Sequence, residues 1–156
     1  MIRAVGVPNL VELRPANLSD LDAIVALELA CFSHGWSKQS WADQIRDNYV
    51  AVATFDQVIG ALAMRAVVDT AEVLRIMVTP GQRRTGVGQA LMEYGHTWAQ
   101  TQGAVEVFLE VSEGNQAAIG LYESLGFHQI DRRINYYGPG DDALVYRFLE
   151  VGCLSR

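Results

Sequence analysis

QRRTGVGQALMEY, residues 82–94, is the most informative part of the chain for its fold. It follows Pro80 and places two arginines and two glycines directly before a run in which apolar residues recur at helical spacing. Such spacing is typical of a helix that buries one side. The apolar positions are Val87, Ala90, Leu91, Tyr94 and Trp98. We therefore expect a half-buried helix after the glycines.

The glycine-rich start of this helix predicts an anion site. A helix N-terminus has four backbone N–H groups without intrahelical partners and carries about half a unit of positive charge. Gly86 and Gly88 remove side chains from the approach to this backbone, so that a phosphate can come close. Arg83 and Arg84 add mobile positive charge. We expect a phosphate-rich ligand here, in particular a diphosphate.

Other phosphate loops fit this stretch less well. A nucleotide-hydrolysing P-loop needs Lys followed by Ser or Thr after the second glycine, where this chain has Gln89 and Ala90. A dinucleotide fingerprint needs a third glycine where Leu91 stands, although Glu106 matches its acidic residue about 20 residues further on. For the loop alone, a plain helix start with solvated arginines also remains open.

The rest of the chain predicts a mixed α/β single domain. Period-two alternation predicts strands at 11–16, 49–55, 58–68, 71–78, 104–112, 127–137 and 143–150. Further helices are predicted at 17–32, 36–47 and 115–127, with caps at Asn17 or Ser19, Ser37, Asn115 and Gly126. The element order is β-α-α-β-β-β-α-β-α-β-β. We expect one domain over residues 11–150, a flexible lead-in at 1–10 and a tail at 151–156.

Composition narrows the classes of function. The 156 residues have formal net charge -6, so no basic face for direct nucleic-acid binding is expected. An acidic surface favours cationic partners, although it also serves solubility. The chain has no signal-peptide core and no apolar run of about 18 residues, which predicts neither export nor a membrane location. Cys31 and Cys153 lack paired or metal-ligand spacing, as expected for reduced thiols in the cytoplasm.

Several stretches together resemble one family. The loop Arg83–Gly88, after an apolar strand that ends in VTP, resembles the coenzyme A pyrophosphate loop of the GNAT superfamily of N-acetyltransferases. The stretch FLEVSEGNQAAIGLYESLGF, at its distance from this loop, makes the match highly specific. RRINYY, GDDAL, the terminal strand and CFSHGWSKQSWADQI strengthen it. The resemblance covers about residues 11–150 and implies the GNAT fold.

The resemblance also implies acetyl-CoA as co-substrate, and no metal. Main-chain groups of Ile76, Met77 and Val78 would hold the thioester and the pantetheine arm. The other cofactor-binding residues that it implies are Arg83, Arg84, Thr85, Gly86, Val87, Gly88, Gln89, Asn115 and Tyr122. Asn115 fits a helix N-cap equally well. The three histidines have no His or Cys partner at metal-ligand spacing.

Two residues resemble the family's acid and base. Glu110 lies on the more polar face of its predicted strand, near the C-terminal end, and resembles the general base that takes a proton from an amine. An α-amino group has a pKa of about 7.7–8 against about 10.4 for lysine, so a protein N-terminus gives up its proton more readily. Tyr122 resembles the general acid, because a phenol with a pKa of about 10 can donate to a thiolate. An exposed strand glutamate and a core-facing tyrosine are the structural alternatives.

The substrate is expected in the elements outside the cofactor half. By resemblance, a peptide lies between residues 34–41 and the last hairpin at 134–142, where Trp36 and Tyr137 contact it; aromatic packing is the alternative for both. Gly35 stands where the family is expected to have proline, which predicts a looser loop and broader substrate choice.

Within the superfamily, the chain resembles enzymes that acetylate an N-terminal alanine of a small-subunit ribosomal protein. This implies a protein N-terminus or peptide as partner, a monomer or weak homodimer, and a cytoplasmic location. An acetyltransferase of a small amine, such as an aminoglycoside, polyamine or amino acid, is the first alternative. A noncatalytic acyl-CoA-binding module is the second, and the presence of both Glu110 and Tyr122 disfavours it.

Overall fold

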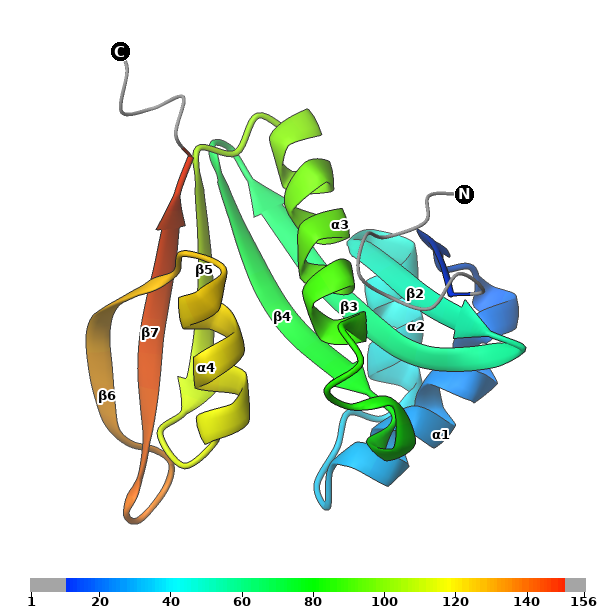
Figure 1. Cartoon of the computed structure of the whole chain (residues 1–156), viewed down its shortest axis with the longest axis horizontal. Helices are drawn as coiled ribbons and strands as arrows, with labels where there is room; N and C mark the ends of the chain where they lie inside the picture. The colour runs from blue at the N-terminus through cyan, green and yellow to red at the C-terminus, as the bar shows by residue number, and fades with distance from the viewer. Residues whose placement is uncertain (1–10, 151–156) are drawn as a thin grey trace. The chain divides into compact units, whose positions relative to one another are not determined.

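The computed structural model describes residues 11–150 of the chain. Its helices and strands follow one another in the predicted order (Figure 1). The lead-in expected at residues 1–10 and the tail expected at 151–156, with Cys153, lie outside the described residues. The bounds are β1 Glu12–Pro15, η1 Leu18–Asp20, α1 Leu21–Cys31, α2 Lys38–Asp47, β2 Tyr49–Phe55, β3 Gln57–Val67, β4 Thr70–Val78, η2 Pro80–Gln82, α3 Val87–Thr101, β5 Glu106–Ser112, α4 Gln116–Ser124, β6 His128–Gly138 and β7 Asp141–Leu149, where η denotes a 3-10 turn.

The strands form a seven-stranded sheet in the order β1-β2-β3-β4-β5-β7-β6. β4 and β5 run parallel, with paired residues from Thr70↔Glu106 to Val73↔Leu109. The pairs β1-β2, β2-β3, β5-β7 and β6-β7 are antiparallel. A parallel pair needs a crossover connection, and α3 supplies it between β4 and β5. The predicted mixed α/β class and element order are thus confirmed.

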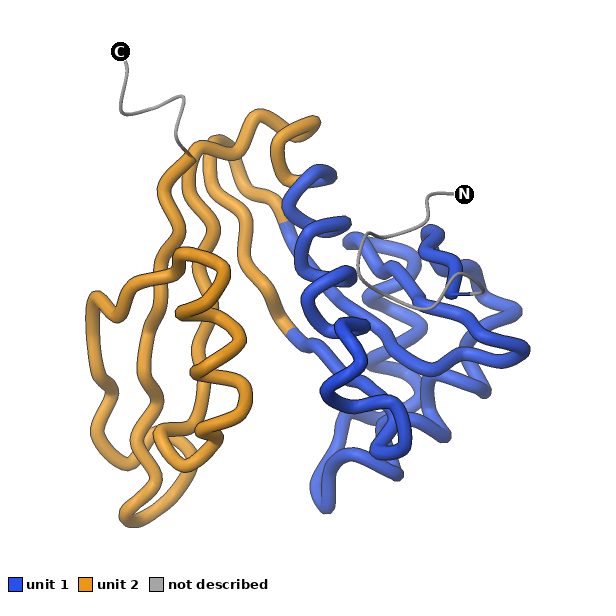
Figure 2. Tube along the Cα trace, in the orientation of Figure 1, with its two compact units in different colours: residues 1–65, 75–98 blue, residues 66–74, 99–156 orange. Residues whose placement is uncertain are grey.

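The chain divides into two compact units, which Figure 2 shows in two colours. Unit 1 contains residues up to Arg65 and the segment Arg75–Trp98, and unit 2 contains Ala66–Leu74 and the residues from Ala99 onward. β4 contributes its first five residues to unit 2 and its last four to unit 1. Among residues 11–150, no helix has both the length and the apolar character needed to cross a membrane.

In unit 1 both faces of the sheet are covered. Residues 59–64 of β3 are buried without interruption, whereas a strand with one covered face would alternate. α3 covers the face of Leu62 and Met64, since an atom at the Cβ position of Gly95 would lie 2.5 Å from each of these side chains. Glycine therefore lets α3 approach β3 closely. α1 and α2 lie on the other side of these strands (Figure 1).

In unit 2, α4 covers one face of β5 and β7. Tyr146 pairs with Leu109 across these strands, and its hydroxyl lies 3.3 Å from a carboxylate oxygen of Glu123 in α4, to which it donates. Along β5, buried residues alternate with partly exposed ones, as the sequence predicts. The buried set, toward α4, is Val107, Leu109 and Val111, and the partly exposed set on the opposite face includes Glu106, Phe108 and Glu110.

Most predicted boundaries shift by one to four residues, and two of these shifts have a clear local cause. The predicted strands 58–68 and 71–78 leave a turn at Asp69–Thr70, but the turn begins one residue earlier, because the hydroxyl of Thr70, the first residue of β4, donates to the Val67 carbonyl oxygen at 3.0 Å. Val68 therefore leaves the strand with φ 56°, a rare conformation for a β-branched residue. The first helix begins as the 3-10 turn η1, where Asn17 is the N-cap and Asp20 completes a capping box.

Candidate functional site

The loop before α3 presents main-chain N–H groups. Arg84 and Gly86 have φ values of 65° and 88°, and such left-handed residues turn successive N–H groups into an anion-binding concavity. The carbonyl of Gly86 accepts the first helical hydrogen bond, from the N–H of Ala90 at 3.0 Å, so Gly86 occupies the N-cap position of α3. The Thr85 hydroxyl donates to the carbonyl of Gln82 and closes the loop.

The N-cap of α3 differs from those of α2 and α4. Ser37 and Asn115 each fill the cap of their helix with a side-chain oxygen, which accepts from Ser40 N–H at 3.0 Å and from Ala118 N–H at 3.2 Å. Gly86 has no side chain with which to do this. The first N–H groups of α3 therefore have no capping oxygen from Gly86, and an anion can take that place. The Asn115 cap expected from the sequence is confirmed.

The end of β4 lies against the same loop within unit 1. The carbonyl oxygen of Val78 accepts from Nε of Arg83 at 3.2 Å and from the thiol of Cys31 at 3.5 Å. Thr79, the next residue, donates its N–H to the carbonyl of Ile59 at 2.8 Å. The structure thus brings the predicted Ile76–Val78 segment and the predicted Arg83–Gly88 loop together.

Glu110 lies in unit 2, on the face of β5 opposite to α4. It follows Leu109, the last residue in the described β4–β5 ladder, and it pairs with Val145 of β7. Its carboxylate lies 3.5 Å from Nη2 of Arg133, and about a third of its side chain is exposed, 30%. A carboxylate in this position is partly open to solvent, near the C-terminal end of β5, and has the Arg133 guanidinium beside it.

Tyr122 is buried in unit 2, with 5% of its surface exposed. Its ring lies 6.0 Å from that of Phe127, measured between centroids. Burial, followed by the nearby Tyr137 phenol, raises the pKa of Tyr122 to about 12. The hydroxyl is therefore protonated at neutral pH. Both expectations for this residue, a core-facing ring and a proton donor, are compatible with this environment.

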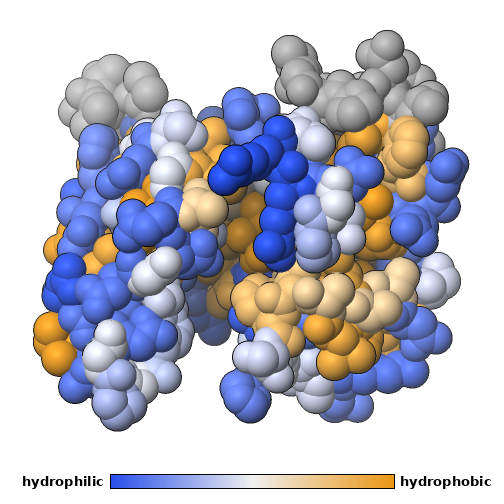
Figure 3. Space-filling model, turned by 60° about the horizontal axis from the view of Figure 1, so that its bottom comes forward, coloured by the Kyte–Doolittle hydropathy of each residue, from blue (hydrophilic) through white to orange (hydrophobic). Residues whose placement is uncertain are grey.

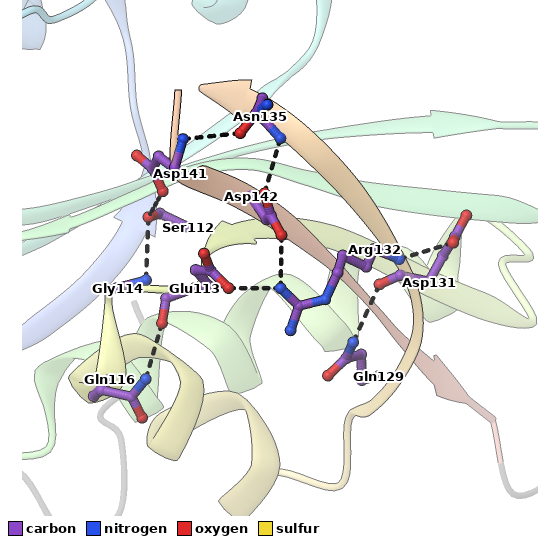
Figure 4. Close-up of polar contacts among 11 residues, drawn as sticks. Ser112, Glu113, Gly114, Gln116, Gln129, Asp131, Arg132, Asn135, Asp141 and Asp142 are labelled. Carbon is purple, nitrogen blue, oxygen red and sulfur yellow. Dashed lines mark hydrogen bonds and ion pairs between the residues drawn. The ribbon is translucent and has the colours of Figure 1, made fainter. Parts of the chain in front are cut away.

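Hydrogen bonds and ion pairs to Asp142 hold the β6–β7 hairpin, which contains Tyr137; Figure 4 shows these contacts. Asn135 has φ 54°, and its N–H donates to Oδ1 of Asp142 at 2.8 Å. Nη1 of Arg132 lies 2.7 Å from Oδ2 of Asp142 and 2.6 Å from Glu113. The Asn135 N–H and the Arg132 guanidinium hold the pKa of Asp142 below its usual value. The sequence placed RRINYY and GDDAL in the family pattern but gave no sign that they bind each other.

A second cluster, in unit 1, surrounds the buried carboxylate of Glu28, which is 1% exposed. Arg75 of β4 forms an ion pair with it at 2.8 Å, and Trp41 of α2 donates its indole N–H to it at 2.8 Å. An atom at the Cβ position of Gly35 would lie 2.5 Å from Oε2 of this carboxylate. A residue with a side chain at position 35 would collide with Glu28, which gives a packing reason for glycine there. The broader substrate choice expected from Gly35 stays a prediction.

The predicted site residues divide between the two units. Unit 1 holds Trp36, Ile76, Met77, Val78, Arg83, Arg84, Thr85, Gly86, Val87, Gly88 and Gln89, and unit 2 holds Glu110, Asn115, Tyr122 and Tyr137. Among residues 11–150, no group of three or more His, Cys, Asp and Glu side chains is arranged to hold a metal ion.

Apolar side chains also reach the surface in both units. The most exposed are Leu18 and Leu29 in unit 1, and Val67, Val68, Ile130, Ile134, Tyr136 and Tyr137 in unit 2. On the face shown in Figure 3, hydrophobic residues lie among hydrophilic ones.

The seven-stranded sheet, with α3 joining the parallel strands β4 and β5 and a glycine at the N-cap position of α3, is that of N-acetyltransferases with the GNAT fold. The chain belongs to the acetyltransferase (GNAT) family, whose model matches residues 21–127. It is 36% identical over 132 residues to a [Ribosomal protein bS18]-alanine N-acetyltransferase from Salmonella typhimurium strain LT2, covering 81% of this chain and 89% of that protein.

Solved structures agree with this family. The ribosomal-protein-S18-alanine N-acetyltransferase from Escherichia coli superposes with a TM-score of 0.82 at 29% identity, over 89% of this chain and 93% of that one. Arabidopsis thaliana NAA60, solved in complex with acetyl-CoA, has the same fold, with a TM-score of 0.81 at 18% identity over 89% of this chain and 98% of that one. The predicted GNAT fold is confirmed.

Proposed function

We propose that this protein is an N-terminal protein acetyltransferase, which transfers the acetyl group of acetyl-CoA to the α-amino group of a protein. The Salmonella and Escherichia coli relatives act on the alanine of a ribosomal protein, and the chain spans about nine-tenths of each. We therefore propose an N-terminal alanine of a small-subunit ribosomal protein as the substrate. Such a substrate implies action in the cytoplasm.

Acetyl-CoA fits the loop of unit 1. Arg84 and Gly86 are left-handed, the α3 N-cap is a glycine, and the two arginines add charge, so a diphosphate would find N–H donors and cations together. We propose that Arg83, Arg84, Thr85, Gly86, Val87, Gly88 and Gln89 hold the diphosphate, mostly through main-chain groups. Ile76, Met77 and Val78 would hold the pantetheine arm, with Asn115 and Tyr122 as further contacts. The bound cofactor would supply an acetyl group activated as a thioester.

We propose Glu110 as the general base, and its open position is the single observation that carries the chemistry. The carboxylate is 30% exposed on the face of β5 that α4 leaves uncovered, so an amine or a bridging water can reach it. Arg133 at 3.5 Å keeps a cation beside the carboxylate. An α-amino group needs only a weak base near neutral pH, because its pKa is about 7.7–8.

We propose Tyr122 as the general acid. Burial keeps its hydroxyl protonated well above neutral pH. A thiolate, whose conjugate acid has a pKa of about 8.5 in an unperturbed thiol, can take a proton from a phenol positioned beside it as it leaves. Acid and base act on different groups, the leaving thiolate and the attacking amine. The two side chains therefore have no need to touch.

Incubation with acetyl-CoA and a panel of peptides tests the proposal. The panel carries Ala, Ser or Met at the N-terminus, or an internal Lys with a blocked N-terminus. Mass spectrometry locates the added acetyl group. We expect the N-terminal alanine peptide to react fastest and the blocked Lys peptide to remain unmodified. A parallel panel of an aminoglycoside, a polyamine and free amino acids examines the small-amine alternative; faster acetylation of one of these would contradict the proposal.

A further inference from the structure

The connection between α1 and α2, residues 32–37, contains neither helix nor strand. Side chains hold it in place instead. Its two aromatic residues, Phe32 and Trp36, pack on the guanidinium of Arg75, whose Cζ lies 4.0 Å and 4.9 Å from their ring centroids. Trp36 also packs on Trp41 of α2, with 4.9 Å between ring centroids. The connection is thus folded around one arginine from β4.

Arg75 is itself fixed by the buried carboxylate of Glu28. Its Nε and Nη2 donate to the two carboxylate oxygens at 3.2 Å and 2.8 Å, which is the fork geometry that only arginine offers. The indole N–H of Trp41 donates to Oε1 at 2.8 Å. Three elements, α1, α2 and β4, therefore meet at one carboxylate. The guanidinium thus binds Glu28 through Nε and Nη2 and packs against the rings of Phe32 and Trp36.

Gly35 completes this packing. A Cβ atom there would meet Oε2, Cγ and Cδ of Glu28 at 2.5, 2.6 and 2.9 Å, closer than real Cβ atoms approach their neighbours. Glu28 is 1% exposed and bound on both oxygens, so its carboxylate has little freedom to yield. Any larger residue at position 35 must move either the connection or the ion pair.

We propose that Glu28 and Arg75 are positioning residues for the amine substrate, and that Gly35 is required by their packing. They fix residues 32–37 before the peptide arrives, so that Trp36 is already placed to contact it. Ordering an irregular segment costs conformational entropy, and a segment that is ordered in advance spares the incoming peptide this cost. The inference rests on the proposed function, in which Trp36 contacts the peptide.

Arg75→Lys is the first test, because lysine keeps the charge but loses both the fork and the flat face. We expect the KM for the alanine peptide to rise about tenfold or more, with kcat and the KM for acetyl-CoA unchanged within about twofold. Hydrogen exchange of residues 32–37 should accelerate while exchange in α3 stays the same. Arg46→Lys is the matched control, since Arg46 is an exposed arginine of α2 paired with Asp43. This variant should change neither the peptide KM nor the hydrogen exchange of residues 32–37.

Gly35→Ala is the second test, from the opposite side of the ion pair. It should raise the same peptide KM and accelerate exchange in the same segment. Because both changes act through Glu28, the double variant should be less impaired than the product of the single effects. Multiplicative effects would show that the two residues act independently and would overturn the proposal, as would an unchanged peptide KM in a variant whose segment exchanges faster.

Failure of the positioning role and failure of the proposed function have different signatures. Wild-type protein that acetylates no peptide refutes the proposed function. In that event hydrogen exchange alone tests whether the ion pair orders residues 32–37. Fast exchange of this segment in the wild type, equal to that in Arg75→Lys, overturns the positioning role. Slow exchange in the wild type that both variants accelerate supports it. A peptide KM and an acetyl-CoA KM that rise together, with a lowered Tm, also overturn it.

Discussion

The Arg83–Gly88 loop of unit 1 and the β5–α4 segment of unit 2 differ in the chemical groups that their proposed roles use. In the proposed function, the loop binds the diphosphate through main-chain N–H groups, which every residue except proline possesses, so its specificity would depend on its φ angles. The β5–α4 segment offers the carboxylate of Glu110 and the hydroxyl of Tyr122, which few residues can replace. Acetyl-CoA binding should therefore survive a change of side chain in the loop wherever φ is preserved. Catalysis should not survive even isosteric changes at Glu110 and Tyr122.

The largest effect is expected for Glu110→Gln, which keeps the shape of the side chain and removes its basicity. We expect kcat to fall about 100-fold or more with acetyl-CoA affinity nearly intact, as is typical when a general base is lost. Steady-state kinetics and calorimetric titration with acetyl-CoA measure the two quantities. Glu106→Gln is the control, because Glu106 lies on the same face of β5 and also pairs with an arginine, Arg147 at 3.7 Å. Equal loss in both variants would contradict the base assignment.

Tyr122→Phe should slow the chemical step by about tenfold to 100-fold, measured as a single-turnover rate. Tyr146→Phe is the control, since it also removes the hydroxyl of a buried tyrosine in unit 2, and its single-turnover rate should match that of the wild type. A single-turnover rate in Tyr122→Phe equal to that of the wild type would remove Tyr122 from the mechanism.

The pKa of Tyr122 also predicts how stability depends on pH. Because folding raises this pKa from 10.0 to about 12, the folded state holds the proton more tightly than the unfolded state. The resulting stabilisation is complete below pH 10 and is lost as the pH rises toward 12. The difference in Tm between wild type and Tyr122→Phe should therefore stay constant up to pH 10 and change above it; a difference that already changes near neutral pH would contradict the assigned shift.

Gly86→Val should raise the KM for acetyl-CoA by about tenfold, because a β-branched residue resists φ 88° and narrows the approach to the N–H groups. Arg84→Gly should leave this KM within a few-fold of wild type, since glycine adopts φ 65° readily and only one charge is lost. Gly81→Ala is the control from the preceding 3-10 turn η2, where a Cβ atom would meet nothing within 4 Å. A larger effect for Arg84→Gly than for Gly86→Val would mean that side-chain charge, and not the main chain, binds the diphosphate.

The smallest effects are expected for two aspartates, one in each unit. The Arg14 guanidinium lowers the pKa of Asp20, and the Asn135 N–H lowers that of Asp142, both from 3.8. A lowered pKa gives stabilisation that is present above pH 3.8 and lost as the pH falls through the folded-state value. Asp20→Asn and Asp142→Asn should therefore lower the urea midpoint at pH 7 and have little effect at pH 2.

The exposed Asp22, paired with Lys38 at the surface, gives a control for these two variants. Surface pairs contribute about 0–1 kcal/mol, so Asp22→Asn should hardly move the midpoint at either pH. A midpoint difference for Asp20→Asn or Asp142→Asn that is as large at pH 2 as at pH 7 would contradict the assigned role of the ionised carboxylates.

The elements were predictable where local patterns agree with burial. The alternation along β5 placed Val107 and Glu110 on opposite faces, and the caps at Ser37 and Asn115 fixed where α2 and α4 begin. The end of β3 was predicted wrongly at Val68. The strand preference of valine favoured a longer strand, whereas a hydrogen bond from the Thr70 hydroxyl closes a turn there. The catalytic roles of Glu110 and Tyr122 and the diphosphate site remain predictions that the experiments above address.

The order of elements, the two faces of β5 and the glycine-rich start of α3 follow from the amino-acid sequence alone, because they depend on residues close together in the chain. Two sets of contacts became visible only in the folded molecule: Glu28 meets Arg75, 47 residues away, and Asn135 and Arg132 meet Asp142 across a hairpin. A polar residue in a sequence does not reveal its partner, because hydrogen-bond geometry is set by how distant elements pack. Gly35 is the clearest case: the sequence alone suggested a loose loop, whereas the structure shows that Glu28 leaves no room for a side chain at this position.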